Sequence, residues 1–145
     1  MSQRIQLAKA DPAAFQAMLG LEKYLSQSGL DKKLYELIKI RASQINGCAY
    51  CINMHTRDAM KIGETPQRIF LLDAWRETKL FTPKERAVLE LTEKVTLIAG
   101  GPISDEVYHE AKSHLTDQEL AAVLMAIATI NAWNRFGITL ENELD

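Results

Sequence analysis

The chain of 145 residues lacks several features that mark common classes of protein. Its formal net charge is only −2, so it has no basic surplus to attract nucleic acid or an anionic membrane surface. No uninterrupted apolar run reaches the roughly 18 residues that a bilayer span requires. No apolar segment near the start precedes a small-residue cleavage site. We therefore expect a cytoplasmic protein that binds neither nucleic acid nor a membrane.

The sequence also lacks the alternation of β-branched and polar residues that indicates a sheet. Its composition, 47% hydrophobic and 25% charged, is typical of a globular domain. Capping residues and helix-stopping glycines instead divide the chain into helices, and we predict an all-α fold in one domain spanning residues 1–145. The seven expected helices cover residues 12–29, 31–45, 48–63, 66–75 and 83–99, a short stretch after 104, and 116–137.

The last of these helices is apolar on nearly every side from Leu120 to Ile130. A helix without a polar face is either the centre of a domain or part of a subunit contact. We expect both, with the core on one side and a homo-oligomer interface on the other. The alternative is a central helix that the other six surround.

Both cysteines of the chain, Cys48 and Cys51, form one C-x-x-C pair directly after the helix stop at Asn46-Gly47, and His55 follows one turn later. In a helix that starts at Cys48, the two thiols and the imidazole share one face. The free N–H groups at the helix start favour a thiolate at Cys48, and His55 can transfer a proton. A disulfide closing so short a loop is worth only about 2 kcal/mol, so stability alone is a weak reason for the pair.

Spacing alone leaves three interpretations of this segment. The first is reversible dithiol–disulfide chemistry. The second is a zinc site, with Cys48, Cys51 and His55 as three ligands and His109, His114 or an acidic residue as the fourth. The third is a pair of buried structural thiols. A thioredoxin-like fold is disfavoured because the βαβ pattern around its motif is absent.

A larger pattern surrounds the pair: Glu36 lies twelve residues before a C-x-Y-C-x-x-x-H group formed by Cys48, Tyr50, Cys51 and His55. This pattern, with its flanking helices over residues 30–65, resembles the AhpD-like alkylhydroperoxidases of the carboxymuconolactone decarboxylase superfamily. The resemblance implies an all-α fold, a trimer or hexamer, and peroxide reduction without a metal or cofactor.

The resemblance also implies a role for each residue of the pattern. Cys51 would attack the peroxide and become a sulfenic acid, which Cys48 would capture as a disulfide. Glu36 and His55 would form the proton relay, through a water, and Tyr50 would shape the site. An external dithiol reductant would restore the pair.

Helical periodicity gives a different expectation for Glu36. At 100° per residue, Glu36 falls opposite the apolar face of its helix, together with Lys39 and Ser43. Taken alone, it is a solvated surface carboxylate. The relay requires instead that this polar side line the thiol site.

Several other polar or aromatic residues have simpler interpretations. Arg41 lies within an apolar face, and we expect it to pair with a buried acid. His109 and His114 are expected at the surface, and Trp75 and Trp133 in the core or at an interface.

Overall fold

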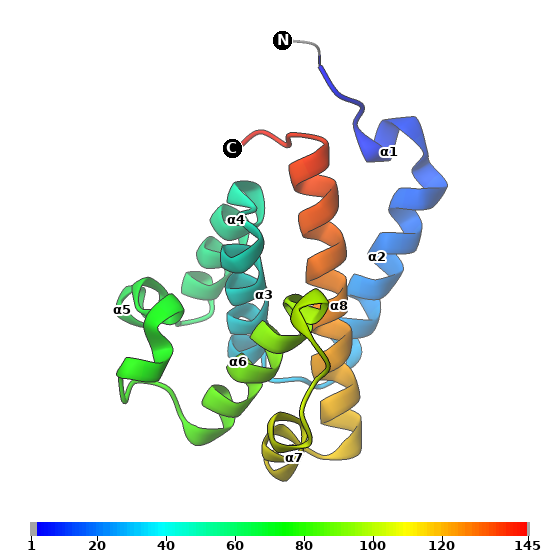
Figure 1. Cartoon of the computed structure of the whole chain (residues 1–145). Helices are drawn as coiled ribbons and strands as arrows, with labels where there is room; N and C mark the ends of the chain where they lie inside the picture. Colours follow the sequence, from blue (N-terminus) through cyan, green and yellow to red (C-terminus); the bar gives the residue numbers. More distant parts are fainter. Residues whose placement is uncertain (1–2, 145) are drawn as a thin grey trace.

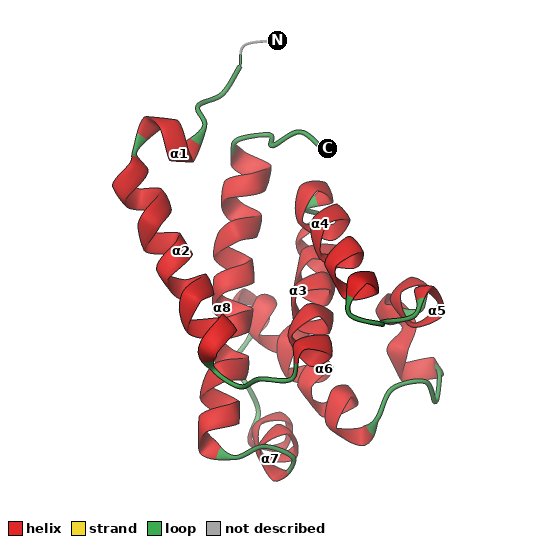
Figure 2. Cartoon of the chain, turned by 180° about the vertical axis from the view of Figure 1, so that it is seen from behind, coloured by secondary structure: helices red, strands yellow, loops and turns green. Residues whose placement is uncertain are grey.

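A computed structural model describes residues 3–144, and within them there are eight α-helices, two 3₁₀ helices and no strand (Figures 1 and 2). The prediction of an all-α fold is confirmed. The elements are α1 (Leu7–Ala10), α2 (Pro12–Gln27), α3 (Lys32–Asn46), α4 (Ala49–Lys61), α5 (Pro66–Phe70), η1 (Leu72–Glu77), α6 (Pro83–Thr96), η2 (Ile98–Gly100), α7 (Asp105–Ser113) and α8 (Asp117–Thr139).

The differences from the predicted helices lie at irregular turns. The helix expected over residues 66–75 is divided into α5 and η1, with a non-helical conformation at Ala74. This bend accompanies the burial of Trp75, whose indole nitrogen reaches a carboxylate on α6. Helix α6 ends at Thr96 rather than near residue 99, and the short α1 was not predicted.

The predicted caps are present in the structure. Thr82 and Thr116 each form a capping box with a glutamate three residues later, which satisfies free N–H groups at the starts of α6 and α8. Gly47 ends α3 in the left-handed conformation, with φ of 72°, and the Cys48 N–H then bonds to the Ser43 carbonyl at 3.0 Å. Helix α4 therefore begins directly after α3, and this short connection fixes where the cysteines lie.

Helix α3 is the centre of the molecule and lies between α4, α6 and α8 (Figure 1). Two consecutive apolar side chains of α3, Leu37 and Ile38, enter two separate core clusters. A third and smaller cluster, around Ala42 and Ile130, contains both cysteines. Almost the whole circumference of α3 is thus covered by other helices.

Helix α8 is long and apolar enough to cross a bilayer by length and composition alone. In this fold it packs against α2, α3, α4 and α6. Its buried residues, such as Val123, Ile127 and Ile130, face those helices, whereas Leu124 is partly exposed. Helix α8 thus contributes one side to the core, as the sequence predicts, and its other side is more exposed.

Arg41 pairs with a buried acid, as the sequence predicts. Its Nε donates to Glu93 Oε2 at 2.8 Å, and Glu93 also accepts from the Trp75 indole at 2.9 Å and from Arg76 at 2.6 Å. Burial alone raises the pKa of Glu93, but these three donors outweigh burial and leave that pKa below its ordinary value. Glu93 thus joins α3, η1 and α6 as a charged group.

This pairing predicts how stability depends on pH. Because the pKa of Glu93 is lower in the folded state, its ionised carboxylate adds to the free energy of unfolding. This stabilisation is fully present above the unfolded pKa of about 4.5 and is lost as pH falls through the folded-state pKa. Glu93→Gln should lower the free energy of unfolding at pH 7 by about 2–4 kcal/mol and flatten the acid limb of the stability curve. Urea titrations from pH 3 to 8 measure both effects. The exposed Glu77→Gln is the control, and an equal loss in that variant would contradict the assignment.

Candidate functional site

The polar side of α3 is buried, and this overturns the expectation that Glu36 is a solvated surface carboxylate. Glu36 is 8% exposed, Lys39 1% and Ser43 0%. Helical periodicity correctly placed the three residues on one side of α3. It failed on burial because α4 and α8 pack over this side as well, and Glu22 of α2 reaches Lys39 there. Each of the three polar groups finds a partner on one of those helices.

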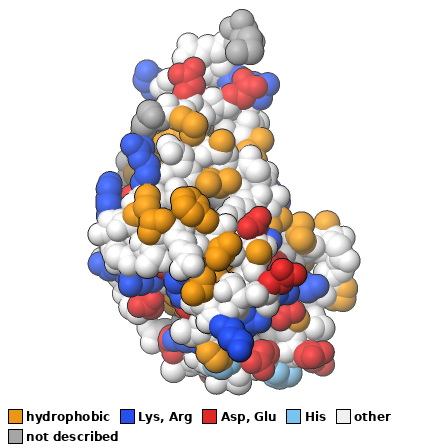
Figure 3. All heavy atoms as spheres, turned by 90° about the vertical axis from the view of Figure 1, so that its left-hand side faces the viewer, with side chains coloured by type: hydrophobic (Ala, Val, Ile, Leu, Met, Phe, Trp, Pro, Cys, Tyr) orange, Lys and Arg blue, Asp and Glu red, His pale blue; other side chains and the backbone are white. Residues whose placement is uncertain are grey.

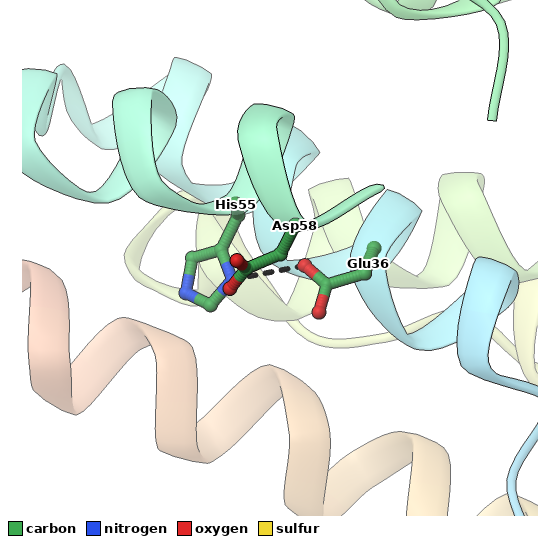
Figure 4. A group of neighbouring side chains, drawn as sticks. All are labelled: Glu36, His55 and Asp58. Atoms are coloured by element: carbon green, nitrogen blue, oxygen red, sulfur yellow. Dashed lines mark hydrogen bonds and ion pairs between the residues drawn. The ribbon is translucent and has the colours of Figure 1, made fainter. Parts of the chain in front are cut away.

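The partner of Glu36 is His55 on α4. His55 Nδ1 lies 2.9 Å from Glu36 Oε2, and both side chains are buried. In Figure 4 the second ring nitrogen of His55 points away from Glu36. A carboxylate that accepts the Nδ1–H proton leaves Nε2 with its lone pair free, which is the tautomer that a general base needs.

Asp58 lies beside this pair, one turn further along α4 (Figure 4). One ligand atom each from Glu36, His55 and Asp58 lies within 4.8 Å of the others, so these residues could hold a metal ion. Within residues 3–144, neither cysteine belongs to such a group. His109 is exposed, and His114 lies 3.2 Å from Glu110. The zinc ligands proposed from the sequence are therefore not brought together.

The two thiols lie at the start of α4. Cys48 is the N-cap residue, one position before the expected helix start, and its Sγ accepts the Cys51 N–H at 3.4 Å. Both cysteines are free thiols, 1% and 2% exposed, and Tyr50 and Trp133 pack against their cluster. The thiols are thus adjacent to each other but closed off from solvent.

Burial, with a hydrogen bond to Cys48, raises the pKa of Cys51 to about 12. A hydrogen bond from Asn134 and the positive charge of Lys39 act in the opposite direction but are weaker. The expectation that the helix start favours a thiolate therefore does not extend to Cys51. At neutral pH this thiol is protonated, so any reaction through it requires a base.

Two residues of α8 form the back wall of the thiol site. A Cβ atom on Gly137 would lie 3.1 Å from Cys48 Sγ and 3.6 Å from Cys51 Sγ, so only glycine leaves the sulfurs unobstructed. Asn134 is fully buried and donates to Ser43 Oγ at 2.9 Å. The sequence carries no signal for Asn134, and it predicted Gly137 as the end of the last helix, whereas α8 continues through Gly137 to Thr139. Both residues act through contacts between distant segments, which the sequence does not show.

Two hollows flank the site. One, of about 930 Å³, lies among α2, α3 and α4, and its lining includes Glu36 and Asp58. The other, of about 630 Å³, includes Tyr50 and Trp133 in its lining, together with residues from both ends of the chain. Neither hollow reaches a sulfur directly. Tyr50 and Trp133 separate the second hollow from the cysteine cluster.

The model of the carboxymuconolactone decarboxylase family matches residues 12–94, which include Glu36, both cysteines, His55 and Asp58. The chain belongs to this family. A relative, the uncharacterized protein YdfG of Bacillus subtilis (strain 168), is 45% identical over 142 residues, covering 98% of this chain and 97% of YdfG.

Solved structures share the AhpD-like fold. Atu0492 from Agrobacterium tumefaciens, a protein of unknown function whose description links it to the antioxidant defence protein AhpD, superposes with a TM-score of 0.95 at 39% identity, covering 99% of each chain. A peroxidase-related protein from Ralstonia eutropha JMP134, described as an alkylhydroperoxidase AhpD core, superposes with a TM-score of 0.83 at 20% identity, covering 95% of this chain and 74% of that one. At 20% identity, the second structure shows only that the two proteins share a fold.

The close approach of Gly137 predicts an unusual response to alanine. Alanine in place of glycine within a helix ordinarily stabilises by about 0.5–1 kcal/mol. Gly137→Ala should instead destabilise by about 1–2 kcal/mol and slow formation of the Cys48–Cys51 disulfide by diamide, because the new methyl group displaces Cys48 Sγ. Thermal unfolding and thiol counting measure the two effects. Gly20→Ala, with no atom near its Cβ position, should stabilise; equal gains at both positions would contradict the crowding.

Proposed function

We propose that this family member is a cysteine-dependent peroxidase that reduces alkyl hydroperoxides or hydrogen peroxide through Cys51 and Cys48. The observation that supports the proposal best is the 2.9 Å contact between the buried Glu36 and His55, one helical turn from a C-x-x-C pair. A base held by a carboxylate beside a protonated thiol is the arrangement that thiol activation needs.

The first step is ionisation of Cys51. His55 Nε2, acting through a water, takes the thiol proton, and Glu36 stabilises the imidazolium that results. The Cys51 thiolate attacks the terminal peroxide oxygen, so that an S–O bond forms as the O–O bond breaks. The alkoxide leaves as an alcohol, with the proton that His55 took up. Cys51 is now a sulfenic acid.

The second step converts the sulfenic acid into a disulfide. Cys48, deprotonated in turn, attacks the Cys51 sulfur, a disulfide forms, and the hydroxyl leaves as water. An external dithiol reductant returns both sulfurs to thiols and is itself oxidised to a disulfide. Because the sulfurs are closed off from solvent, both reactants need Tyr50 or Trp133 to move aside. Tyr50, which is half-buried and lines a hollow, shapes this entry.

A second candidate is a general dithiol–disulfide oxidoreductase or redox sensor. The two free thiols in one cluster favour it, because such a pair can exchange with a disulfide whether or not peroxide is the oxidant. The rate constant with peroxide, compared with that for small disulfides, distinguishes the two candidates.

We further propose that the protein is a homo-oligomer, a trimer or hexamer, which its molar mass in solution tests. Apolar side chains gather on the face that carries α4 and α5 (Figure 3). Met54, Met60 and Phe70 are exposed there, and Phe70 is 77% exposed. Patches of this kind commonly mark protein contacts.

The two cysteines should have separable roles. Cys51→Ser should reduce peroxide consumption by roughly two orders of magnitude or more, because no nucleophile remains. Cys48→Ser should still consume about one equivalent of peroxide and then stop, leaving a sulfenic acid that dimedone traps on Cys51. Stopped-flow peroxide consumption with a dithiol reductant measures both. Full activity in Cys51→Ser would refute the mechanism.

The relay predicts a specific effect of Glu36. Glu36→Gln keeps the shape but cannot stabilise the imidazolium, so the rate with peroxide should fall about 10²-fold and the midpoint of its pH profile should rise. Asp58→Asn is the matched control, because Asp58 is adjacent but is not hydrogen-bonded to His55. Identical pH profiles for Glu36→Gln and wild type would remove Glu36 from the relay.

A further inference from the structure

The site contains a second buried charge that the proposed relay does not use. The Lys39 side chain is 1% exposed, and its ammonium lies 2.6 Å from Glu22 Oε1 on α2 and 4.2 Å from the centre of the Tyr35 ring. Burying an ammonium is costly even when it is paired, and an apolar residue of similar size often serves stability as well. The position of Lys39 therefore calls for a reason beyond packing.

Glu22 keeps this pair charged. Its carboxylate accepts hydrogen bonds from Tyr35 Oη at 2.5 Å, Lys39 Nζ at 2.6 Å and Trp133 Nε1 at 2.9 Å. Burial acts to raise the pKa of Glu22, but these donors and the charge of Lys39 bring it below its ordinary value. The carboxylate is thus ionised at neutral pH. Burial lowers the pKa of Lys39, and the charge and hydrogen bond of Glu22 oppose that shift and favour the ammonium.

Lys39 lies on α3 between Glu36 and Ser43, two residues that contact the thiol site. Glu36, three residues earlier on the same side of α3, bonds to His55, and Ser43, four residues later, accepts from Asn134. Spacings of three and four residues place Lys39 within one turn of each.

The surroundings of Cys51 offer few other charges. Cys48 and His55 come from its own helix, Glu36 and Lys39 from α3, and the neutral Asn134 from α8. Glu36 is bonded to His55, and the positive charge of Lys39 already lowers the pKa of Cys51 against the larger effect of burial. Trp133 packs against the cysteine cluster and donates to Glu22, the partner of Lys39, so the Lys39–Glu22 pair adjoins that cluster. Among the groups named, Lys39 is the cation.

We propose that Lys39 is an electrostatic positioning residue for Cys51, whose ammonium stabilises the Cys51 thiolate, and that Glu22 sets how much of this charge the sulfur feels. The inference rests on the thiol chemistry of the proposed function but does not depend on peroxide as the oxidant. When Cys51 gives its proton to His55, a negative charge appears on a buried sulfur, next to the cluster that the Lys39–Glu22 pair adjoins. Because the disulfide carries no such charge, Lys39 favours the reduced, ionised state over the oxidised one.

The test is the pH dependence of alkylation of Cys51 by iodoacetamide, in a Cys48→Ser background so that one thiol reacts. The midpoint of the profile reports ionisation, whereas its plateau reports access and structure. Lys39→Met should raise the midpoint by about one unit or more, which slows alkylation on the order of tenfold at a fixed pH below it. Lys39→Arg keeps the charge and should leave the midpoint close to that of the wild type.

The double variant Lys39→Met/Glu22→Gln separates the effect of the Lys39 charge from the structural effect of losing the ion pair. It leaves no unpaired buried charge, so its midpoint should lie above that of the wild type but below that of Lys39→Met, in which the unpaired Glu22 opposes ionisation as well. It also decides the question if Lys39→Met does not fold, as judged by circular dichroism.

A wild-type midpoint in the double variant, or equal midpoints in Lys39→Arg and Lys39→Met, would overturn the proposal. A wild-type protein that is inert to peroxide but shows the expected order of midpoints would instead refute the peroxidase function and leave the role of Lys39 standing.

Discussion

The structure depends on the burial of the polar side of α3. Most surface helices bury one apolar stripe and leave the other side to water. Helix α3 is covered all round, so Glu36, Lys39 and Ser43 must each be satisfied by another residue, because an unpaired buried polar group costs several kcal/mol. Their partners come from three different helices, so these contacts fix how α2, α4 and α8 approach α3.

The same burial creates the chemical problem that the site has to solve. A dry pocket suppresses ionisation of Cys51, and its high pKa keeps the resting thiol inert. In the account proposed here, His55 removes the proton, Glu36 holds the resulting charge, and Lys39 stabilises the thiolate. Reactivity would then arise only when all three act together with a bound substrate, which protects the Cys51 thiol from indiscriminate oxidation.

Much of this arrangement could be predicted from the sequence, because it depends on local rules. Capping residues and glycines predicted the helices, and the stop at Gly47 predicted that the cysteines begin a new helix. The five-residue pattern around the C-x-x-C pair indicated the family that the comparisons then showed.

What the sequence could not give depends on contacts between distant segments. Periodicity separates polar from apolar sides but does not tell whether a polar side is covered, which is why Glu36 alone suggested a surface carboxylate. The approach of Gly137 to the sulfurs and the pairing of Lys39 with Glu22 are set by where α8 and α2 dock. The sequence also did not show that burial raises the pKa of Cys51, because the helices that cover this thiol come from distant segments.

The most direct test of the account is peptide mass spectrometry of the reduced protein at intervals after one equivalent of a hydroperoxide. The account predicts a loss of two hydrogens on the peptide that contains Cys48 and Cys51, completed within the time in which the peroxide disappears. A peptide that keeps both thiols while peroxide is consumed, or that carries oxygen on Cys51 without ever forming the disulfide, would contradict it.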